Sequence, residues 1–337
     1  MNISKYRPVI LPDTFCASIG KALQSPFDVD SSIKRIRNTL NSLPAGKLYI
    51  SNQKHKVTFY SMIDGKQSYL SKQSNQIYPL ARKRYLELLL EILQLTTSTK
   101  ISDMKHRRLL IYKLENLIYV YAKGNLDLAK IVLTSKQYKW YTGDFWQKFI
   151  DPSKSLETAS GVLVRSKSER DIINAIESLA IPLHYEEQTI ISVRPLVEKL
   201  RDDLNRRLKS GEQLSGFSKG QLYAFKNENI HWNVPAELEW MNAHGSIWKS
   251  YYPSDGTVVI YNDFVIMLAN GELFIWEHSG LMDNFIYRCN ASERIAVMKY
   301  TGVTSRNNFL ETYEHDIDTP EKLINIIERT ILPRLWF

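Results

Sequence analysis

The chain has 337 residues, of which 44% are hydrophobic and 24% are charged, a composition that is typical of folded proteins and excludes an intrinsically disordered chain. No stretch approaches the roughly 18–20 consecutive apolar residues of a membrane span, and residues 1–12 lack the layout of a secretion signal. The two cysteines, Cys16 and Cys289, are too few for a disulfide framework or a cysteine zinc site. We therefore expect a cytoplasmic protein that does not enter a membrane. The net charge of +8 is unevenly divided, because residues 1–150 carry 24 Lys and Arg against 10 Asp and Glu, whereas residues 151–337 carry 20 against 26.

This charge division coincides with an expected domain division. Domains usually have about 100–200 residues, so the length predicts a basic domain over residues 1–150 and a more acidic one over residues 151–337. A basic half is expected to meet a polyanion such as nucleic acid. A solvated surface without a partner explains the same composition equally well.

The predicted elements of the first half are mainly helical, with a small β region. Residues 1–30 contain three prolines and no clear period, and are interpreted as a tail or docking arm. Apolar residues at helical spacing predict a helix over residues 31–43. Alternating residues then predict strands over 47–51 and 57–63, with a third over 67–70.

Two long helices follow, from Pro79 to about Leu95 and from about Ser102 to Ala122, and a shorter one is expected after them. Each long helix has a cluster of cations near its start, where positive charge opposes the helix dipole. A docked anion would remove this conflict, and so would neighbouring carboxylates. On the first interpretation, the residues that bind phosphate groups of a nucleic acid are Arg82, Lys83, Arg84, Arg107 and Arg108.

The second half is predicted to alternate helices and strands. Aromatic residues between positions 136 and 150 are expected to seal the joint between the two domains, and residues 192–257 are interpreted as an insertion that shapes a substrate channel or contacts a partner protein. The predicted elements are a helix over 168–179, strands over 183–191, 258–267 and 272–276, a helix over about 290–300, a strand over 309–313 and a last helix that opens at Thr319.

Three acidic residues occupy positions where they could hold a cation. Glu169 lies in the first turn of a predicted helix, Asp263 lies inside an apolar strand, and Glu277 ends the next strand. A carboxylate in an apolar strand is costly to bury unless it is paired or bound to a cation. Oxygen ligands favour magnesium, manganese or calcium over zinc. For Glu169 the alternative is a favourable interaction with the helix dipole alone.

Three short strings in the second half are distinctive when taken together. They are VRSKSE at residues 164–169, YNDF at 261–264 and WEHSGLMD at 276–283. They are similar to the R-S-K-S-E, Y-P-D-F and W-E-H-x-G-M-M-D strings of an uncharacterised bacterial branch of the PD-(D/E)XK, or restriction-endonuclease-like, nuclease superfamily. Residues 43–51, the hairpin after them and the helix with Leu80-Ala81 also resemble that branch.

The resemblance implies an α/β fold with a restriction-endonuclease-like mixed sheet flanked by helices, preceded by a mainly helical domain with a small β-hairpin. It implies that Asp263 and Glu277 bind Mg²⁺ or Mn²⁺ and that Glu169 completes the site. The implied activity is metal-assisted hydrolysis of DNA phosphodiester bonds, in restriction, phage defence or repair. Many nucleases of this fold act as dimers, so a homodimer is among the expected assemblies.

The sequence departs from the motif after Glu277. Ser279 stands where the motif lysine is expected, and a hydroxyl cannot supply its positive charge. His278 could act in catalysis or be a packed, hydrogen-bonded histidine. Arg294 and Lys299 lie on the following helix, where a base can substitute for the lysine in related nucleases. Because arginine hardly deprotonates, Arg294 is expected to hold a phosphate rather than to act as a base.

Two functions of different classes follow from these observations. The first is a metal-dependent DNA endonuclease with a basic nucleic-acid-binding region. The second is a non-catalytic nucleic-acid-binding or protein-interaction protein that retains the nuclease fold, and Ser279 is the residue that favours it. Replacing Asp263 separates the two, because only a nuclease would lose an activity.

Overall fold

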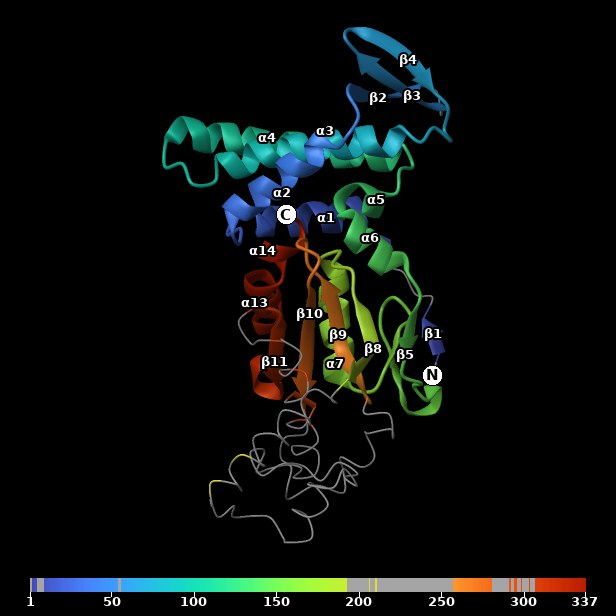
Figure 1. Ribbon diagram of the computed structural model, residues 1–337, viewed down its shortest axis with the longest axis vertical. Coiled ribbons are helices and arrows are strands. Elements are labelled where there is room, and N and C mark those ends of the chain that lie inside the picture. The colour runs from blue at the N-terminus through green and yellow to red at the C-terminus, as the bar shows by residue number, and fades with distance from the viewer. Residues whose placement is uncertain are drawn as a thin grey trace.

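The computed structural model describes residues 2–4, 9–53, 56–192, 257–280 and 307–337, together with residues 206, 210, 291, 294, 295, 298 and 303. Most of the predicted insertion at 192–257 and of the predicted helix at 290–300 therefore lies outside the described residues. The described part has three layers: a small sheet at one end, a layer of helices in the middle and a larger sheet with its own helices at the other end (Figure 1).

The larger sheet has six strands in the order β1-β5-β8-β9-β10-β11. Its neighbouring strands are antiparallel except for β10 and β11, which are parallel, so the sheet is mixed and the predicted mixed α/β class is confirmed. The strands are β1 (Asn2–Ser4), β5 (Phe145–Gln147), β8 (His184–Ser192), β9 (Thr257–Met267), β10 (Leu273–Ser279) and β11 (Phe309–Tyr313).

Two helices pack on this sheet and on each other, α7 (Lys167–Ser178) and α13 (Pro320–Thr330). The apolar residues of α7 fall at helical spacing, and their side chains are fully buried in the core. Thr319 caps α13 by accepting a hydrogen bond from the Lys322 N–H, and Pro320 occupies its first turn. Both helices lie within one residue of where the sequence predicts them to begin.

The middle layer contains the helices of the first half of the chain. The predicted long helices are confirmed as α3 (Ile77–Gln94) and α4 (Ile101–Lys123), which pack against each other, with the Tyr121 hydroxyl donating to the Ala81 carbonyl over 3.0 Å. The other helices of this layer are α1 (Pro12–Ala22), α2 (Val29–Asn41), α5 (Leu128–Val132) and α6 (Ser135–Thr142).

The helix α1 corrects the interpretation of the first thirty residues as a tail. Phe15 is fully buried against the C-terminal Trp336, with ring centroids 4.9 Å apart in an edge-to-face arrangement. The Trp336 indole also donates a hydrogen bond to the Ser18 hydroxyl over 2.8 Å. A helix of 11 residues gives a weak period, and its partner lies at the far end of the sequence, so a local pattern could not reveal it.

The small sheet consists of β2 (Lys47–Gln53), β3 (Lys56–Ile63) and β4 (Lys66–Leu70), all antiparallel. The three predicted strands are therefore confirmed. Asp64 and Gly65 both have positive φ angles, of 49° and 76°, as the two-residue turn between β3 and β4 requires. Phe59 and Leu70 pack with Ile77 and Leu80 of α3, so one face of this sheet is buried.

The two halves of the sequence share one core. β1 and β5 precede residue 151 and yet belong to the six-stranded sheet. The rings of Trp140 of α6 and Phe145 of β5 stack against His184 of β8, with centroids 3.9 Å and 3.8 Å away, and so Trp140 joins the helical layer to the sheet. Short pairs and turns complete the described chain: β6 (Leu156–Glu157), β7 (Leu163–Val164), η1 (Pro152–Lys154), η2 (Glu314–Asp316) and α14 (Leu332–Leu335). Among the described residues, none of the helices has the length and apolar composition to span a bilayer.

Candidate metal centre

The strands β8, β9 and β10 place one acidic residue each at the same level of the sheet. Tyr185 pairs with Phe264 and Glu187 with Asn262, so Glu186 lies opposite Asp263. On the other side of β9, Phe264 pairs with Trp276, which brings Glu277 next to Asp263. Residues opposite each other on neighbouring strands share a face of the sheet. The structure therefore brings the two predicted metal ligands, Asp263 and Glu277, together.

The backbone pairing of β9 and β10 ends at this level. Beyond the pair of Phe264 with Trp276, the Asp263 N–H donates to Glu277 Oε1 over 3.2 Å, and the His278 N–H donates to Asp263 Oδ2 over 2.9 Å. Each carboxylate thus accepts a backbone N–H from the opposite strand in place of a carbonyl oxygen. These two backbone hydrogen bonds hold the carboxylates of Asp263 and Glu277 in position where the strand pairing ends.

Glu186 has an unusual backbone conformation for a strand residue. Its φ angle is 53°, in the left-handed region that is unfavourable for residues with a side chain, although it is the third residue of β8. Strained backbone of this kind costs on the order of 1–3 kcal/mol and gathers at functional sites. The side chain is almost completely buried beside Asp263.

Glu169 enters the site from the first turn of α7. Its carboxylate closes a capping box, in which Oε2 accepts from the Ser166 N–H over 2.9 Å and the Ser166 hydroxyl accepts from the Glu169 N–H over 3.2 Å. Oε2 also accepts from the Tyr185 hydroxyl over 3.0 Å. Glu169 therefore both caps the helix, where a negative charge is favourable, and contributes a carboxylate to the acidic cluster.

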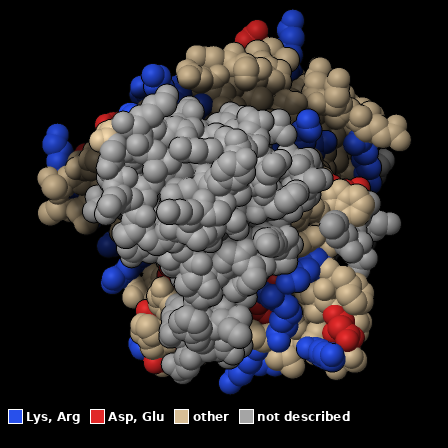
Figure 2. Space-filling view, turned by 60° about the horizontal axis from the view of Figure 1, so that its bottom comes forward, with Lys and Arg blue, Asp and Glu red and all other residues tan. Residues whose placement is uncertain are grey.

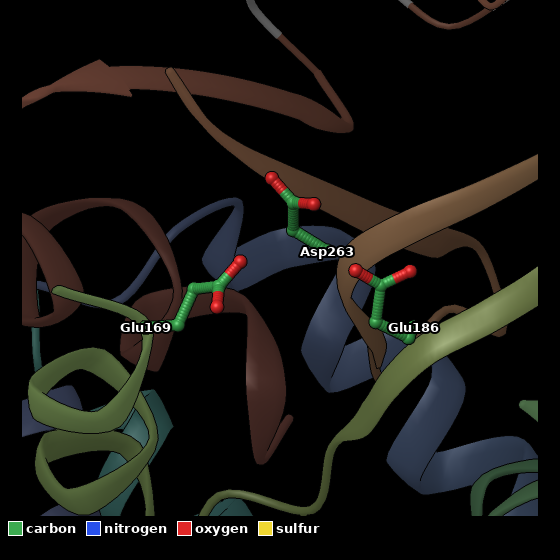
Figure 3. A group of neighbouring side chains, drawn as sticks. All are labelled: Glu169, Glu186 and Asp263. Carbon is green, nitrogen blue, oxygen red and sulfur yellow. The ribbon is translucent and has the colours of Figure 1, made fainter. Parts of the chain in front are cut away.

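The carboxylates of Glu169, Glu186 and Asp263 converge on one small space (Figure 3). One oxygen from each lies within 4.8 Å of the others, and all three residues are buried. The oxygens around a six-coordinate magnesium ion with bonds of about 2.0–2.1 Å are roughly 3–4 Å apart, so a small inward movement fits this set to the ion. The donor set consists of oxygens alone, which suits Mg²⁺ or Mn²⁺.

Arg165 contacts all three of these acids. Its Nη2 atom lies 2.9 Å from Glu169 Oε1 and 3.2 Å from Asp263 Oδ1, and it also forms an ion pair with Glu186. The side chain is 40% exposed, so it has a path to solvent. A cation bound by these oxygens would take over contacts that Arg165 now makes.

A second arginine, Arg294, forms ion pairs with Glu277 and Asp263. Its Nη2 atom is 2.5 Å from Glu277 Oε2 and 3.8 Å from Asp263 Oδ2. It thus supplies a positive charge near Glu277, where Ser279 cannot; the buried Ser279 hydroxyl donates to Glu311 over 3.4 Å. Lys299, which is predicted with Arg294 to bind phosphate, lies outside the described residues.

Burial changes the proton affinity of two acids in the cluster. Burial raises the pKa of Glu186 to about 7, an effect that Arg165 opposes and Asp263 reinforces. Burial likewise raises the pKa of Glu277 well above its ordinary value, while Arg294 opposes and Asp263 reinforces this shift. Burial alone would lower the pKa of Arg165, but Glu186 and the other acids raise it overall. The cluster is therefore short of positive charge even with both arginines in place.

The imidazole of His278 faces away from this cluster. Its Nδ1 lies 3.1 Å from the Thr312 hydroxyl, and its Nε2 lies 3.3 Å from Glu314 Oε1. Since the Thr312 oxygen accepts from the Trp276 indole over 2.8 Å, its own proton is available to Nδ1, and Nε2 then donates to Glu314. Only the backbone N–H of His278 reaches Asp263.

Four of the five cations of the first half that are predicted to bind phosphate have partners within the protein. The Arg82 guanidinium donates to the carbonyls of Ile131, over 3.0 Å, and Leu133, at the end of α5. Their remaining contacts run from Lys83 to the Pro44 carbonyl, from Arg84 to Glu87 and from Arg107 to the Leu23 carbonyl, and Arg108 is exposed. In the view of Figure 2, Lys and Arg side chains are spread around the margin of the described surface, with Asp and Glu among them.

Replacing Arg82 by methionine should lower the free energy of unfolding by about 1–3 kcal/mol, because the carbonyls at the end of α5 lose their buried donor. DNA affinity of the folded variant should not change. Chemical denaturation and a DNA-binding titration measure the two effects. The exposed Arg108→Met variant is the control and should stay within about 0.5 kcal/mol of the wild type. A variant of Arg82 that is fully stable and binds DNA more weakly would contradict this role.

Two residues of the cluster, Glu186 and Arg165, were not predicted as site residues. Glu186 lies in a predicted strand beside a second glutamate, and only the register with β9 shows which of the two faces Asp263. Arg165 is part of the VRSKSE string, which is the signal that could have included it. Comparisons of the chain with protein-family models, with curated proteins and with solved structures found no match. The membership of a nuclease superfamily therefore stays a proposal.

Proposed function

We propose that the protein is a metal-dependent endonuclease that hydrolyses DNA phosphodiester bonds, with a catalytic region of the restriction-endonuclease-like type. The observation that carries this proposal is the convergence of four buried carboxylates, from Glu169, Glu186, Asp263 and Glu277, at the level where β9 and β10 separate. Burying four acids is costly, and two arginines balance only part of their charge. A divalent cation would balance the rest.

Glu169, Glu186 and Asp263 would hold the ion, and Glu277 would lie beside it, paired with Arg294. A bound Mg²⁺ or Mn²⁺ supplies Lewis acidity, which activates water and stabilises charge on a phosphate. The Arg294 guanidinium stays charged at all relevant pH values and presents several N–H donors, so it suits a phosphate oxygen better than a proton transfer. The capping box of Glu169 and the ladder end at Asp263 keep these acids in place before any substrate arrives.

The charge division of the sequence supports a nucleic acid as substrate. The first 150 residues carry a net charge of +14, and this region shares its core with the six-stranded sheet. Phosphate contacts from Lys and Arg provide affinity without sequence preference. We propose restriction, phage defence or repair as the setting of the activity, with a homodimer or a protein partner bound through residues 192–257 as its assembly.

Incubation with supercoiled plasmid and with circular single-stranded DNA tests this function, because circles are cut only by an endonuclease. In Mg²⁺ or Mn²⁺ we expect nicked or linear products, and in EDTA we expect none. Circles that stay intact under all conditions would show that the protein lacks the proposed endonuclease activity. Cutting that persists in EDTA would contradict a metal-dependent mechanism.

The second candidate function is a non-catalytic nucleic-acid-binding protein, and the contacts of Arg165 favour it. A guanidinium that contacts three carboxylates can replace a cation permanently. In that case the protein binds DNA in a salt-dependent manner, leaves every circle intact and does not bind Mn²⁺. Intact circles together with tight Mn²⁺ binding would exclude this second candidate as well.

A further inference from the structure

The small sheet carries a row of three tyrosines across its three strands. Tyr49 of β2 pairs with Tyr60 of β3, and Tyr60 pairs with Tyr69 of β4. Because paired residues share a face, the three side chains lie on the same side of the sheet. The rings of Tyr60 and Tyr69 are 6.0 Å apart between centroids and meet at 75°.

This face of the sheet is turned away from the helices. The opposite face, with Phe59 and Leu70, is packed on α3 and supplies the buried surface that holds the sheet in place. Tyr49 is 55% exposed and Tyr69 is 64% exposed. Figure 1 shows the sheet projecting from the end of the molecule beyond α3. The tyrosine row is therefore an aromatic surface that is open to a ligand at Tyr49 and Tyr69.

The charge around the row is strongly positive. Residues 44–76 contain five lysines and one aspartate, and they contain no arginine and no glutamate. Lys47 lies two positions before Tyr49 on the same strand, and side chains two apart point to the same face. Lys47 is exposed, whereas Lys66 of β4 lies on the opposite face, together with Leu70. Exposed aromatic rings beside a lysine, on a segment with a net positive charge, are complementary to a ligand that presents both flat rings and phosphates.

We propose that the row of Tyr49, Tyr60 and Tyr69 binds single-stranded DNA by stacking of unpaired bases. The exposed rings of Tyr49 and Tyr69 each offer a surface to one base, and Lys47 contacts a phosphate beside them. A duplex does not present its base faces, so it would gain only the phosphate contacts. The choice of DNA over RNA rests on the proposed nuclease function, whereas the stacking surface itself does not.

Binding is measured in EDTA, where no metal-dependent cutting can occur, by fluorescence anisotropy of a labelled oligo(dT). We expect Tyr49→Ala and Tyr69→Ala each to weaken binding roughly tenfold or more, as the loss of one base–aromatic stack does. Tyr49→Phe and Tyr69→Phe keep the ring and should bind like the wild type. Thermal unfolding confirms that each variant is folded.

The control is Tyr112→Ala on α4, an equally exposed tyrosine outside the row, at 61%. It should leave binding unchanged. The proposal is overturned if the alanine variants of the row bind as tightly as the wild type, if Tyr112→Ala weakens binding equally, or if duplex DNA binds as tightly as oligo(dT). Tighter binding of oligo(U) would overturn the assignment to DNA. A protein that binds oligo(dT) through this row and never cuts a circle would support this inference and contradict the nuclease.

Discussion

Replacing Arg165 by methionine is expected to destabilise the metal-free protein by about 3 kcal/mol, because removing one partner of a buried charge cluster leaves the other charges unbalanced. Glu169, Glu186 and Asp263 are buried and all contact this one guanidinium. Methionine keeps the apolar stem and removes only the charged group. If these acids form a cation site, Mn²⁺ can replace the missing charge.

The measurement is urea denaturation of the wild type and the variant, once in EDTA and once in millimolar Mn²⁺. In EDTA we expect the full loss of stability. In Mn²⁺ we expect most of it to be recovered, because a ligand that binds only the folded state stabilises it by about 2.7 kcal/mol at a hundred times its dissociation constant. Arg170→Met on the adjoining helix α7 removes a half-buried arginine that pairs with Asp171, outside the acidic cluster, and should be insensitive to Mn²⁺. An Arg165 variant with the same deficit in both media would mean that the arginine is a permanent part of the fold.

Replacing Asp263 by asparagine is expected to lower metal-dependent DNA cleavage about a thousandfold. Asp263 is the acid that lies near both arginines of the cluster, 3.2 Å from Arg165 and 3.8 Å from Arg294, and it also accepts from the N–H of His278. Asparagine keeps the size of the side chain and one acceptor oxygen but removes the charge. Several kcal/mol of charge stabilisation depend on a bound ion, and about 4 kcal/mol corresponds to a thousandfold in rate.

Initial rates of plasmid nicking, at equal concentrations of folded protein, give the ratio. Asp171→Asn is the matched control, because Asp171 lies on α7 two residues after Glu169 and its side chain is 46% exposed. The control should cut at the rate of the wild type, and DNA affinity should be the same for all three proteins. An Asp263 variant that cuts at an undiminished rate would place the catalytic centre elsewhere.

Local patterns in the sequence predict much of the fold and part of the site. The apolar context of Asp263 marks it as a costly carboxylate, and the alternation around residues 47–70 predicts the small sheet. These features depend on neighbours in the chain. The motif strings also contain Arg165 and Glu169, although only their tertiary contacts reveal that the arginine binds three acids.

The remaining features depend on residues that are distant in the sequence. Glu186 joins the site because of the register between β8 and β9 and because of its left-handed backbone, and neither is encoded in a local pattern. Arg82 follows the start of a helix as an anion-binding residue would, yet its partners are carbonyls about fifty positions later. Leaving those carbonyls without a donor would cost free energy, and the Arg82 side chain avoids this cost by donating to them.

Calorimetric titration of Mn²⁺ into the wild type and into Asp263→Asn tests the cation site most directly, because it measures binding without a substrate. We predict saturable binding to the wild type and its loss in the variant, with both proteins equally folded by circular dichroism. Asp171→Asn should bind like the wild type. Absence of Mn²⁺ binding to the wild type, or equal binding by Asp263→Asn, would contradict the assignment of this acidic cluster as a metal centre.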